Sequence, residues 1–110
     1  MATSNNRPDD RPNLLVIHTD QQSFWTLGCY GGTVIDTPNI DRLAAEGVRL
    51  DNFFANSAVC TPSRGCFLTG RYPHSHGAYR NNIPLNRDEV TWAQVLRRAG
   101  YATGYVGKWH

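Results

Sequence analysis

Residues 13–20, NLLVIHTD, place the strongest constraint on the fold, because four branched apolar side chains in succession are followed by three polar ones. A short, nearly continuous apolar run of this kind is typical of a strand that is buried on both faces of a parallel sheet. The polar residues from His18 to Asp20 would then lie at the carboxyl end of that strand. Two further runs, VRLDNFFAN at 48–56 and YATGYVG at 101–107, are predicted to be strands as well.

Helical segments alternate with these strands. In the first, Thr37 is predicted to be the N-cap, Pro38 the first helical residue and Gly47 the stop. The other predicted helices run from about Pro62 to Gly70, and over 88–100, where acidic residues come first and arginines last. Strands that alternate with helices predict an α/β fold, with a mainly parallel sheet flanked by helices.

Composition limits the classes of function. The 110 residues, 40% of them hydrophobic and 18% charged, suit one domain or part of one, and a net charge of +2 is too small to indicate binding to nucleic acid or to an anionic membrane. Residues 1–12 have no apolar core of a signal peptide and are predicted to be a disordered leader. Three cysteines make an odd count, which argues against a disulfide framework and favours a reduced, cytoplasmic compartment.

Ligands of parallel α/β folds bind beyond the carboxyl ends of the strands. This rule gathers three polar clusters, at residues 20–21, 60–64 and 108–110. Cys60 would lie directly in front of a helix N-terminus, whose free N–H groups favour an anion, and Arg64 would add a positive charge one turn later. The sequence therefore predicts an anion pocket around Cys60.

Other interpretations of Cys60 remain open from the residues alone. It could be a small buried side chain, or the nucleophile of a thiolate phosphatase, although only three residues separate it from Arg64 and one of them is proline. A zinc site is a further alternative, since thiolate and imidazole are preferred zinc ligands, but the spacing of the candidate ligands fits no usual pattern. Those candidates are Cys60, Cys66, His74 and His76.

Long motifs in the chain resemble the sulfatase family. CTPSRGCFLTGR at 60–71 is similar to the first sulfatase signature, and GYATGYVGKWH at 100–110 is similar to the second. The segments 11–22, 37–60 and 72–77 also resemble sulfatases in the same order. The resemblance covers residues 12–110 and implies the α/β fold of the alkaline phosphatase superfamily.

The resemblance implies that the cysteine is modified. In the family, the residue that matches Cys60 is oxidised by a separate formylglycine-generating enzyme to formylglycine, and the motif recognised by that enzyme matches Cys60, Thr61, Pro62, Ser63 and Arg64. The hydrated aldehyde carries two hydroxyl groups. One attacks the sulfur of a small sulfate-ester substrate, and the other later expels sulfate, a step for which serine has no second hydroxyl.

Further site residues follow from the same matching. Asp20, Gln21 and the modified Cys60 match ligands of a divalent metal, with Ca²⁺ expected and Mn²⁺ or Mg²⁺ as alternatives. Gln21 departs from the Asp found in many members, which removes one negative charge. Arg64, Lys108 and His110 match the residues that hold formylglycine and sulfate, with His110 as the candidate base.

Sulfatases are much longer than this chain, so residues 13–110 are predicted to be the amino-terminal part of a sulfatase catalytic domain, inactive by itself. A formylglycine-dependent phosphonate monoester or phosphodiester hydrolase is the alternative enzyme. A catalytically dead fragment that binds an anion or another subunit is the alternative from a different class. Cys66 is predicted to pack inward, and His74 and His76 to be structural or at the edge of the substrate site. The predicted core aromatics are Phe53, Phe54, Trp92 and Tyr101.

Overall fold

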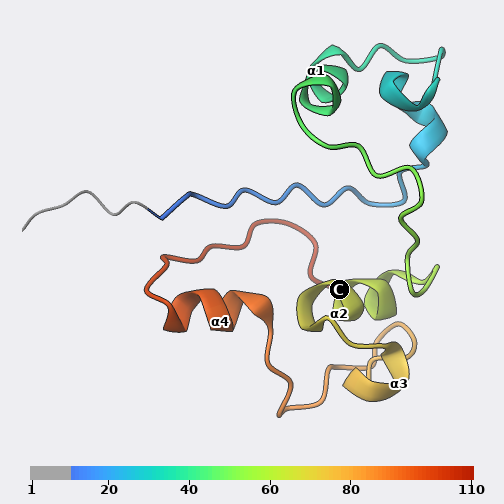
Figure 1. Cartoon of the computed structure of the whole chain (residues 1–110). Helices are drawn as coiled ribbons and strands as arrows, with labels where there is room; N and C mark the ends of the chain where they lie inside the picture. The colour runs from blue at the N-terminus through green and yellow to red at the C-terminus, as the bar shows by residue number, and fades with distance from the viewer. Residues whose placement is uncertain (1–10) are drawn as a thin grey trace, which may run out of the picture. The chain divides into compact units, whose positions relative to one another are not determined.

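The computed structural model describes residues 11–110 (Figure 1). The chain divides into two compact units, Met1–Leu43 and Ala44–His110, and each is described by itself. Apart from residues 11 and 12, the predicted leader lies outside the described residues. The helical elements in chain order are η1 (Phe24–Thr26), η2 (Gly28–Tyr30), α1 (Pro38–Glu46), α2 (Cys60–Thr69), α3 (Pro73–His76) and α4 (Trp92–Arg98).

Residues 11–110 contain helices and irregular backbone but no strand, so the strands predicted at 13–20, 48–56 and 101–107 are not formed. The apolar residues 14–17 are between 49% and 85% exposed. A β-strand forms only when its backbone is hydrogen-bonded to a neighbouring strand, and an apolar run in the sequence does not specify that neighbour. The pattern identified segments suited to a sheet, but no described segment pairs with them.

In the first unit, one carboxylate connects α1 to the 3₁₀ turns. Asp41 Oδ1 accepts hydrogen bonds from the Cys29 N–H at 2.7 Å and from the Thr37 hydroxyl at 3.0 Å. Thr37 Oγ1 in turn accepts from the Gly28 N–H at 2.8 Å. Thr37 therefore precedes α1 as predicted, but its hydroxyl binds the backbone of η2. The helix ends at Glu46, immediately before the predicted stop at Gly47.

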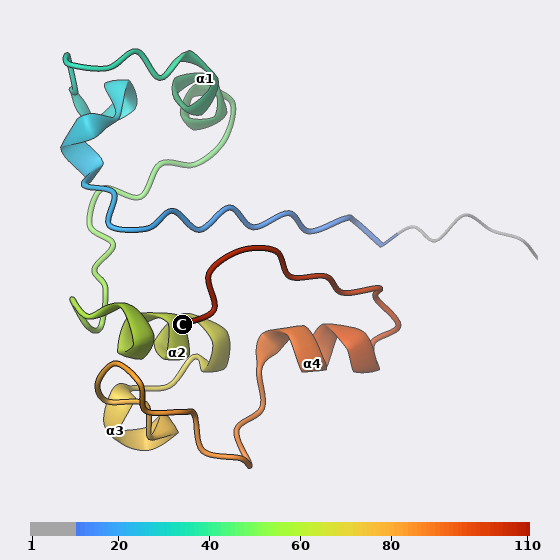
Figure 2. The ribbon, with the colours of Figure 1, turned by 180° about the vertical axis from the view of Figure 1, so that it is seen from behind.

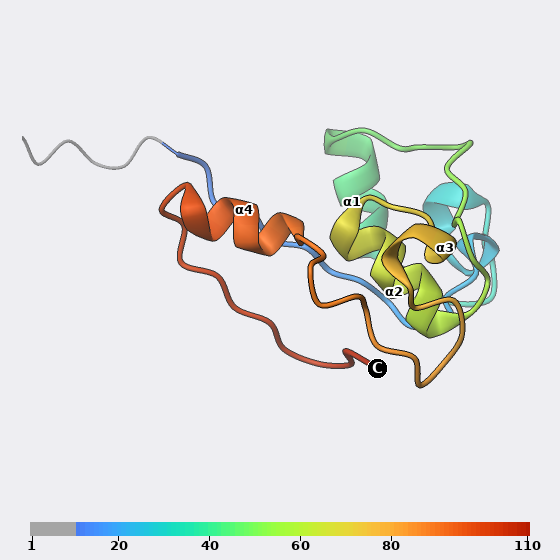
Figure 3. The same cartoon turned by 90° about the horizontal axis from the view of Figure 1, so that it is seen from below.

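In the second unit, α2 is the central helix. Both α3 and α4 contact it, and the contact between α2 and α4 includes an edge-to-face pair of Phe67 and Trp92 whose ring centroids are 5.9 Å apart. Figures 1 and 2 show the final segment of the chain returning to α2, and Figure 3 shows α2 and α3 from below. The buried apolar side chains of the described residues are Pro62, Cys66, Leu68 and Ala78.

Glycine and threonine set the helix ends in this unit. Gly70 ends α2 in the left-handed region, with φ 68°, as predicted. At its other end α2 begins at Cys60, two residues before the predicted start. The prediction that α4 begins at 88 is wrong: Thr91 is its N-cap and forms a capping box with Gln94, so the helix starts at Trp92.

The predicted core is only partly correct. Cys66 packs inward as predicted, with 8% of its surface exposed. Phe53 and Phe54 are 78% and 80% exposed, so their assignment to the core is wrong. Trp92 and Tyr101 are half-buried. The aromatic content alone could not separate these cases, because burial depends on which helix lies opposite each ring. No helix within residues 11–110 is both long and apolar enough to cross a membrane.

Candidate functional site

Cys60 is the first residue of α2, in its first turn rather than in front of it. The N-cap residue, Val59, has extended backbone angles and no side-chain oxygen to offer the helix. Asn81 provides that oxygen instead: its Oδ1 accepts from the Thr61 N–H at 3.1 Å and lies 3.3 Å from Cys60 Sγ. A residue from a distant loop therefore caps α2 and contacts the cysteine at the same time.

Asn81 was not predicted from the sequence. It belongs to the polar run RNN at 80–82, which follows α3 by a few residues. The only feature of the sequence that could indicate this role is the residue type, because Asn is a favoured capping residue. A capping residue is normally expected immediately before its helix, however, and Asn81 lies far from the start of α2 in the sequence. The contact depends on how the loop after α3 folds back on α2.

Removal of the Asn81 carbonyl is expected to loosen the first turn of α2. In Asn81→Ala the Thr61 N–H loses its acceptor, which should lower the free energy of unfolding by about 1 kcal/mol. The amide of Thr61 should then exchange with deuterium about fivefold faster, whereas Asn81→Asp should keep the wild-type rate because its carboxylate also accepts.

The matched control is the neighbouring Asn82→Gly, since Asn82 is exposed and its φ of 65° suits glycine. This variant should leave the exchange of Thr61 unchanged. A Thr61 amide that exchanges at the wild-type rate in Asn81→Ala would show that the helix does not depend on this cap.

The two signature segments meet on α2. Arg64, only 7% exposed, donates from Nη1 to the carbonyl oxygen of Lys108 at 2.8 Å. Thr61 donates from Oγ1 to the carbonyl oxygen of His110 at 3.2 Å. The predicted approach of residues 108–110 to residues 60–64 is therefore present. It is made through backbone carbonyls, while the side chains of Lys108 and His110 remain exposed.

A small pocket lies beside these contacts. Its free volume of about 30 Å³ is enough for a water molecule but far below that of a typical ligand site. This cavity is therefore too small to be the predicted anion pocket, and the first turn of α2 beside it is itself largely buried. The pocket is lined by Thr61, Arg64, Gly65, Leu68, Ala78, Ile83, Pro84, Leu85, Trp109 and His110.

The candidate metal ligands Asp20 and Gln21 belong to the first unit, whereas Cys60 belongs to the second. Both residues are exposed, and Gln21 adopts a positive φ of 54°. A carboxylate and an amide oxygen are suitable donors for Ca²⁺, but they supply only part of the six to eight oxygens that it takes. Within the described part of the chain, no three His, Cys, Asp or Glu side chains cluster as a metal site.

The zinc alternative fails on geometry. Cys66 Sγ lies 3.5 Å from His76 Nε2, but Cys60 is directed to Asn81 and does not join them. Burial raises the pKa of the Cys66 thiol above its ordinary value, which keeps it protonated and unreactive. Cys29, Cys60 and Cys66 are thiols that form no disulfide, and Cys60 is half-buried.

Comparison with known proteins identifies the family. The sulfatase family model matches residues 12–110. N-acetylglucosamine-6-O-sulfatase of Bacteroides thetaiotaomicron is 45% identical over 100 residues, covering 91% of this chain and 18% of that protein. Steryl-sulfatase of Rattus norvegicus is 48% identical over 117 residues, covering 94% of this chain and 20% of that protein.

N-acetylgalactosamine-6-O-sulfatase of Bacteroides thetaiotaomicron is 46% identical over 111 residues, covering 96% of this chain and 22% of that protein. The chain thus spans about a fifth of the length of the curated relatives it matches. Because the family model covers nearly the whole chain, including both signature segments that meet on α2, this chain belongs to the sulfatase family.

Proposed function

We propose that this chain contributes the nucleophile end of a sulfate-ester hydrolase site, with Cys60 converted to formylglycine. The observation that carries the proposal is the position of Cys60 in the first turn of α2, with Asn81 Oδ1 beside its sulfur and the second signature segment held next to it by Arg64. The named activities of the relatives, hydrolysis of sugar and steroid sulfates, indicate the class of substrate.

Asn81 would orient the nucleophile. Its Oδ1 lies 3.3 Å from the Cys60 sulfur, so a hydroxyl of the hydrated formylglycine at that place would donate to the same oxygen. The other hydroxyl attacks the sulfur of the ester, and the alcohol leaves. The hydroxyl held by Asn81 then loses its proton and re-forms the aldehyde, while the bond between the carbon and the sulfate oxygen breaks and sulfate departs.

Positive charge around Cys60 would stabilise the sulfate oxygens during attack. The N-terminus of α2 provides partial positive charge through the helix dipole, and Arg64 provides a full charge one turn into the helix. Lys108 is the residue whose carbonyl oxygen Arg64 binds, and its side chain would contact the sulfate group. His110, on the same segment, would accept the proton from the second hydroxyl.

Asp20 and Gln21 would each contribute an oxygen ligand to a divalent cation. When bound, Ca²⁺, or Mn²⁺ or Mg²⁺ in its place, supplies the charge that polarises a sulfate oxygen and favours loss of the hydroxyl proton. The neutral amide of Gln21 contributes an oxygen but no charge. The chain therefore binds the cation with one negative charge fewer than a pair of aspartates would give.

Conversion of Cys60 is the first test of this function. Coexpression with a formylglycine-generating enzyme is expected to replace the sulfur and two hydrogens of Cys60 by one oxygen, while Cys29 and Cys66 stay thiols. Peptide mass spectrometry after alkylation reads out all three positions at once. Cys60→Ala is the control that cannot be converted. If Cys60 stays alkylatable after coexpression, the chain is an unmodified anion-binding or subunit-binding module.

A second candidate is a formylglycine-dependent phosphonate monoester or phosphodiester hydrolase, because Asp20 and Gln21 at the metal site are compatible with it and its substrates carry one negative charge, as a sulfate ester does. The same converted nucleophile would attack phosphorus instead of sulfur. Assay of an active protein that contains this chain with an aryl sulfate and with a phenyl phosphonate separates the two. Faster turnover of the sulfate supports the first proposal, and faster turnover of the phosphonate the second.

A further inference from the structure

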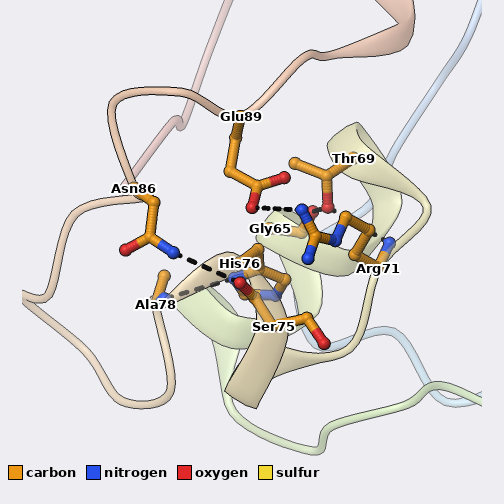
Figure 4. Close-up of polar contacts among 8 residues, drawn as sticks. All are labelled: Gly65, Thr69, Arg71, Ser75, His76, Ala78, Asn86 and Glu89. Carbon is orange, nitrogen blue, oxygen red and sulfur yellow. Dashed lines mark hydrogen bonds and ion pairs between the residues drawn. The ribbon is translucent and has the colours of Figure 1, made fainter.

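His76 is a completely buried side chain that the proposed mechanism does not use. Its Nδ1 accepts a hydrogen bond from the Ala78 N–H at 3.2 Å (Figure 4). Because Nδ1 accepts, the ring hydrogen lies on Nε2, which faces Cys66 Sγ at 3.5 Å. Both ring nitrogens are therefore occupied inside the second unit, one on the backbone after α3 and one on α2.

The ring of His76 also packs against a glycine of α2. A Cβ placed on Gly65 would lie 2.5 Å from His76 Cε1 and 2.9 Å from Nε2, so only glycine permits this approach. Gly65 directly follows Arg64, about 1.4 turns from Cys60. The imidazole therefore fixes how closely α3 approaches the helix that carries the nucleophile.

The same residue closes the loop at 77–86. The His76 carbonyl oxygen accepts from the Asn86 N–H at 2.9 Å, and Asn86 Nδ2 donates to the Ser75 carbonyl at 3.2 Å (Figure 4). Gly77, with φ 86°, leaves room for this side chain, since a Cβ there would lie 2.3 Å from Asn86 Oδ1. The loop is thus tied at its base, and Asn81 lies within it.

We propose that His76 is a positioning residue for Cys60. Its Nδ1 accepts from the Ala78 N–H and, with the backbone carbonyl oxygen of the same residue, fixes the base of the loop that brings Asn81 Oδ1 to the Thr61 N–H and the Cys60 sulfur. The packing of the ring against Gly65 is a separate contact, which both substitutions below remove. The role of Cys60 as nucleophile rests on the proposed function, but the positioning itself is a property of the unmodified chain and is measured there.

The test compares two substitutions of His76 in the full, unconverted chain. In His76→Asn the side-chain oxygen replaces Nδ1 as acceptor for Ala78, whereas His76→Leu has no acceptor. The rate at which iodoacetamide alkylates Cys60 is measured by peptide mass spectrometry, with the exchange rate of the Thr61 amide. His74→Asn is the matched control, since His74 is exposed on the same helix.

His76→Leu is expected to raise both rates about fivefold, the effect of one lost hydrogen bond. His76→Asn should keep both within about twofold of wild type, and His74→Asn should change neither. Cys66 is the internal reference: the smaller Asn leaves space beside it, so its alkylation rises in His76→Asn even though that of Cys60 does not.

Equal rates at Cys60 for the Asn and Leu variants would overturn the proposal, as would wild-type protection of Cys60 in a folded His76→Leu variant. If circular dichroism shows that His76→Leu unfolds, His76→Asn decides: retained protection of Cys60 supports the proposal, and its loss overturns it. Unfolding of both variants would overturn it too, because the residue would then serve folding in general. None of these readings requires formylglycine, so they are independent of a failed conversion.

Discussion

Replacement of Cys60 by serine is expected to stop sulfate-ester hydrolysis after a single turnover in an active protein that contains this chain. Serine has one hydroxyl, so it can attack sulfur and become sulfated, but it has no second hydroxyl with which to expel the sulfate. The steady-state rate should fall by about 10⁴-fold or more, the scale seen when a covalent nucleophile is removed. Intact-peptide mass spectrometry should find sulfate on residue 60.

Two variants control this result. Cys60→Ala should be equally inactive but should carry no sulfate, and Cys29→Ser should keep turnover within about twofold because the Cys29 side chain has no part in the proposed chemistry and serine is close to it in size. Sustained turnover by Cys60→Ser at a rate near wild type would mean that a second hydroxyl at this position is unnecessary, and the proposed mechanism would be wrong.

Truncation of Arg64 is expected to have the second largest effect, on stability and activity together. Arg64→Ala removes a buried guanidinium and leaves the Lys108 carbonyl without this donor. Loss of a buried charged hydrogen bond and of the packing of the long side chain should lower the free energy of unfolding by about 2–4 kcal/mol. Turnover should fall by about 10³-fold, because the positive charge beside Cys60 is lost as well.

Thermal unfolding and limited proteolysis near Gly107 measure this change, since the final segment should detach from α2. Arg64→Lys should recover only part of the loss, because lysine keeps the charge but not the planar fork of donors. Arg98→Ala, which removes an exposed arginine at the end of α4, should change stability by no more than about 0.5 kcal/mol. Similar unfolding midpoints for Arg64→Ala and Arg98→Ala would contradict the role assigned to Arg64.

The C-terminal ends of helices were predicted well from the sequence where a glycine follows the last helical residue. α1 ends immediately before Gly47, and α2 ends at Gly70, which adopts the left-handed conformation that glycine permits, as expected. The start of α4 was misplaced because the acidic residues at 88–89 were given more weight than the capping box of Thr91 and Gln94. Both signals are local, and the hydrogen-bonded cap is the stronger one.

Features that need a distant partner could not be predicted in the same way. Family membership implies the alkaline-phosphatase-like α/β fold, yet residues 11–110 form no sheet, since strand pairing depends on neighbours that a single apolar run does not specify. The rule that ligands bind beyond the carboxyl ends of parallel strands predicted that residues 60–64 and 108–110 come together, and they do, although the described residues form no strands. The contributions of Asn81 and His76 depend on the path of the loop between them, which carries no sequence motif of its own.

The final segment, residues 108–110, is held by its backbone, whereas its proposed chemistry belongs to its side chains. Thr61 and Arg64 donate hydrogen bonds to backbone carbonyl oxygens of residues 108–110, and every amino acid has such an oxygen. A mutation of Lys108 or His110 therefore alters the functional group presented at the site while the anchorage of the segment persists. Such an arrangement lets evolution exchange the reactive side chains of this segment one at a time, without first having to rebuild the scaffold that carries them.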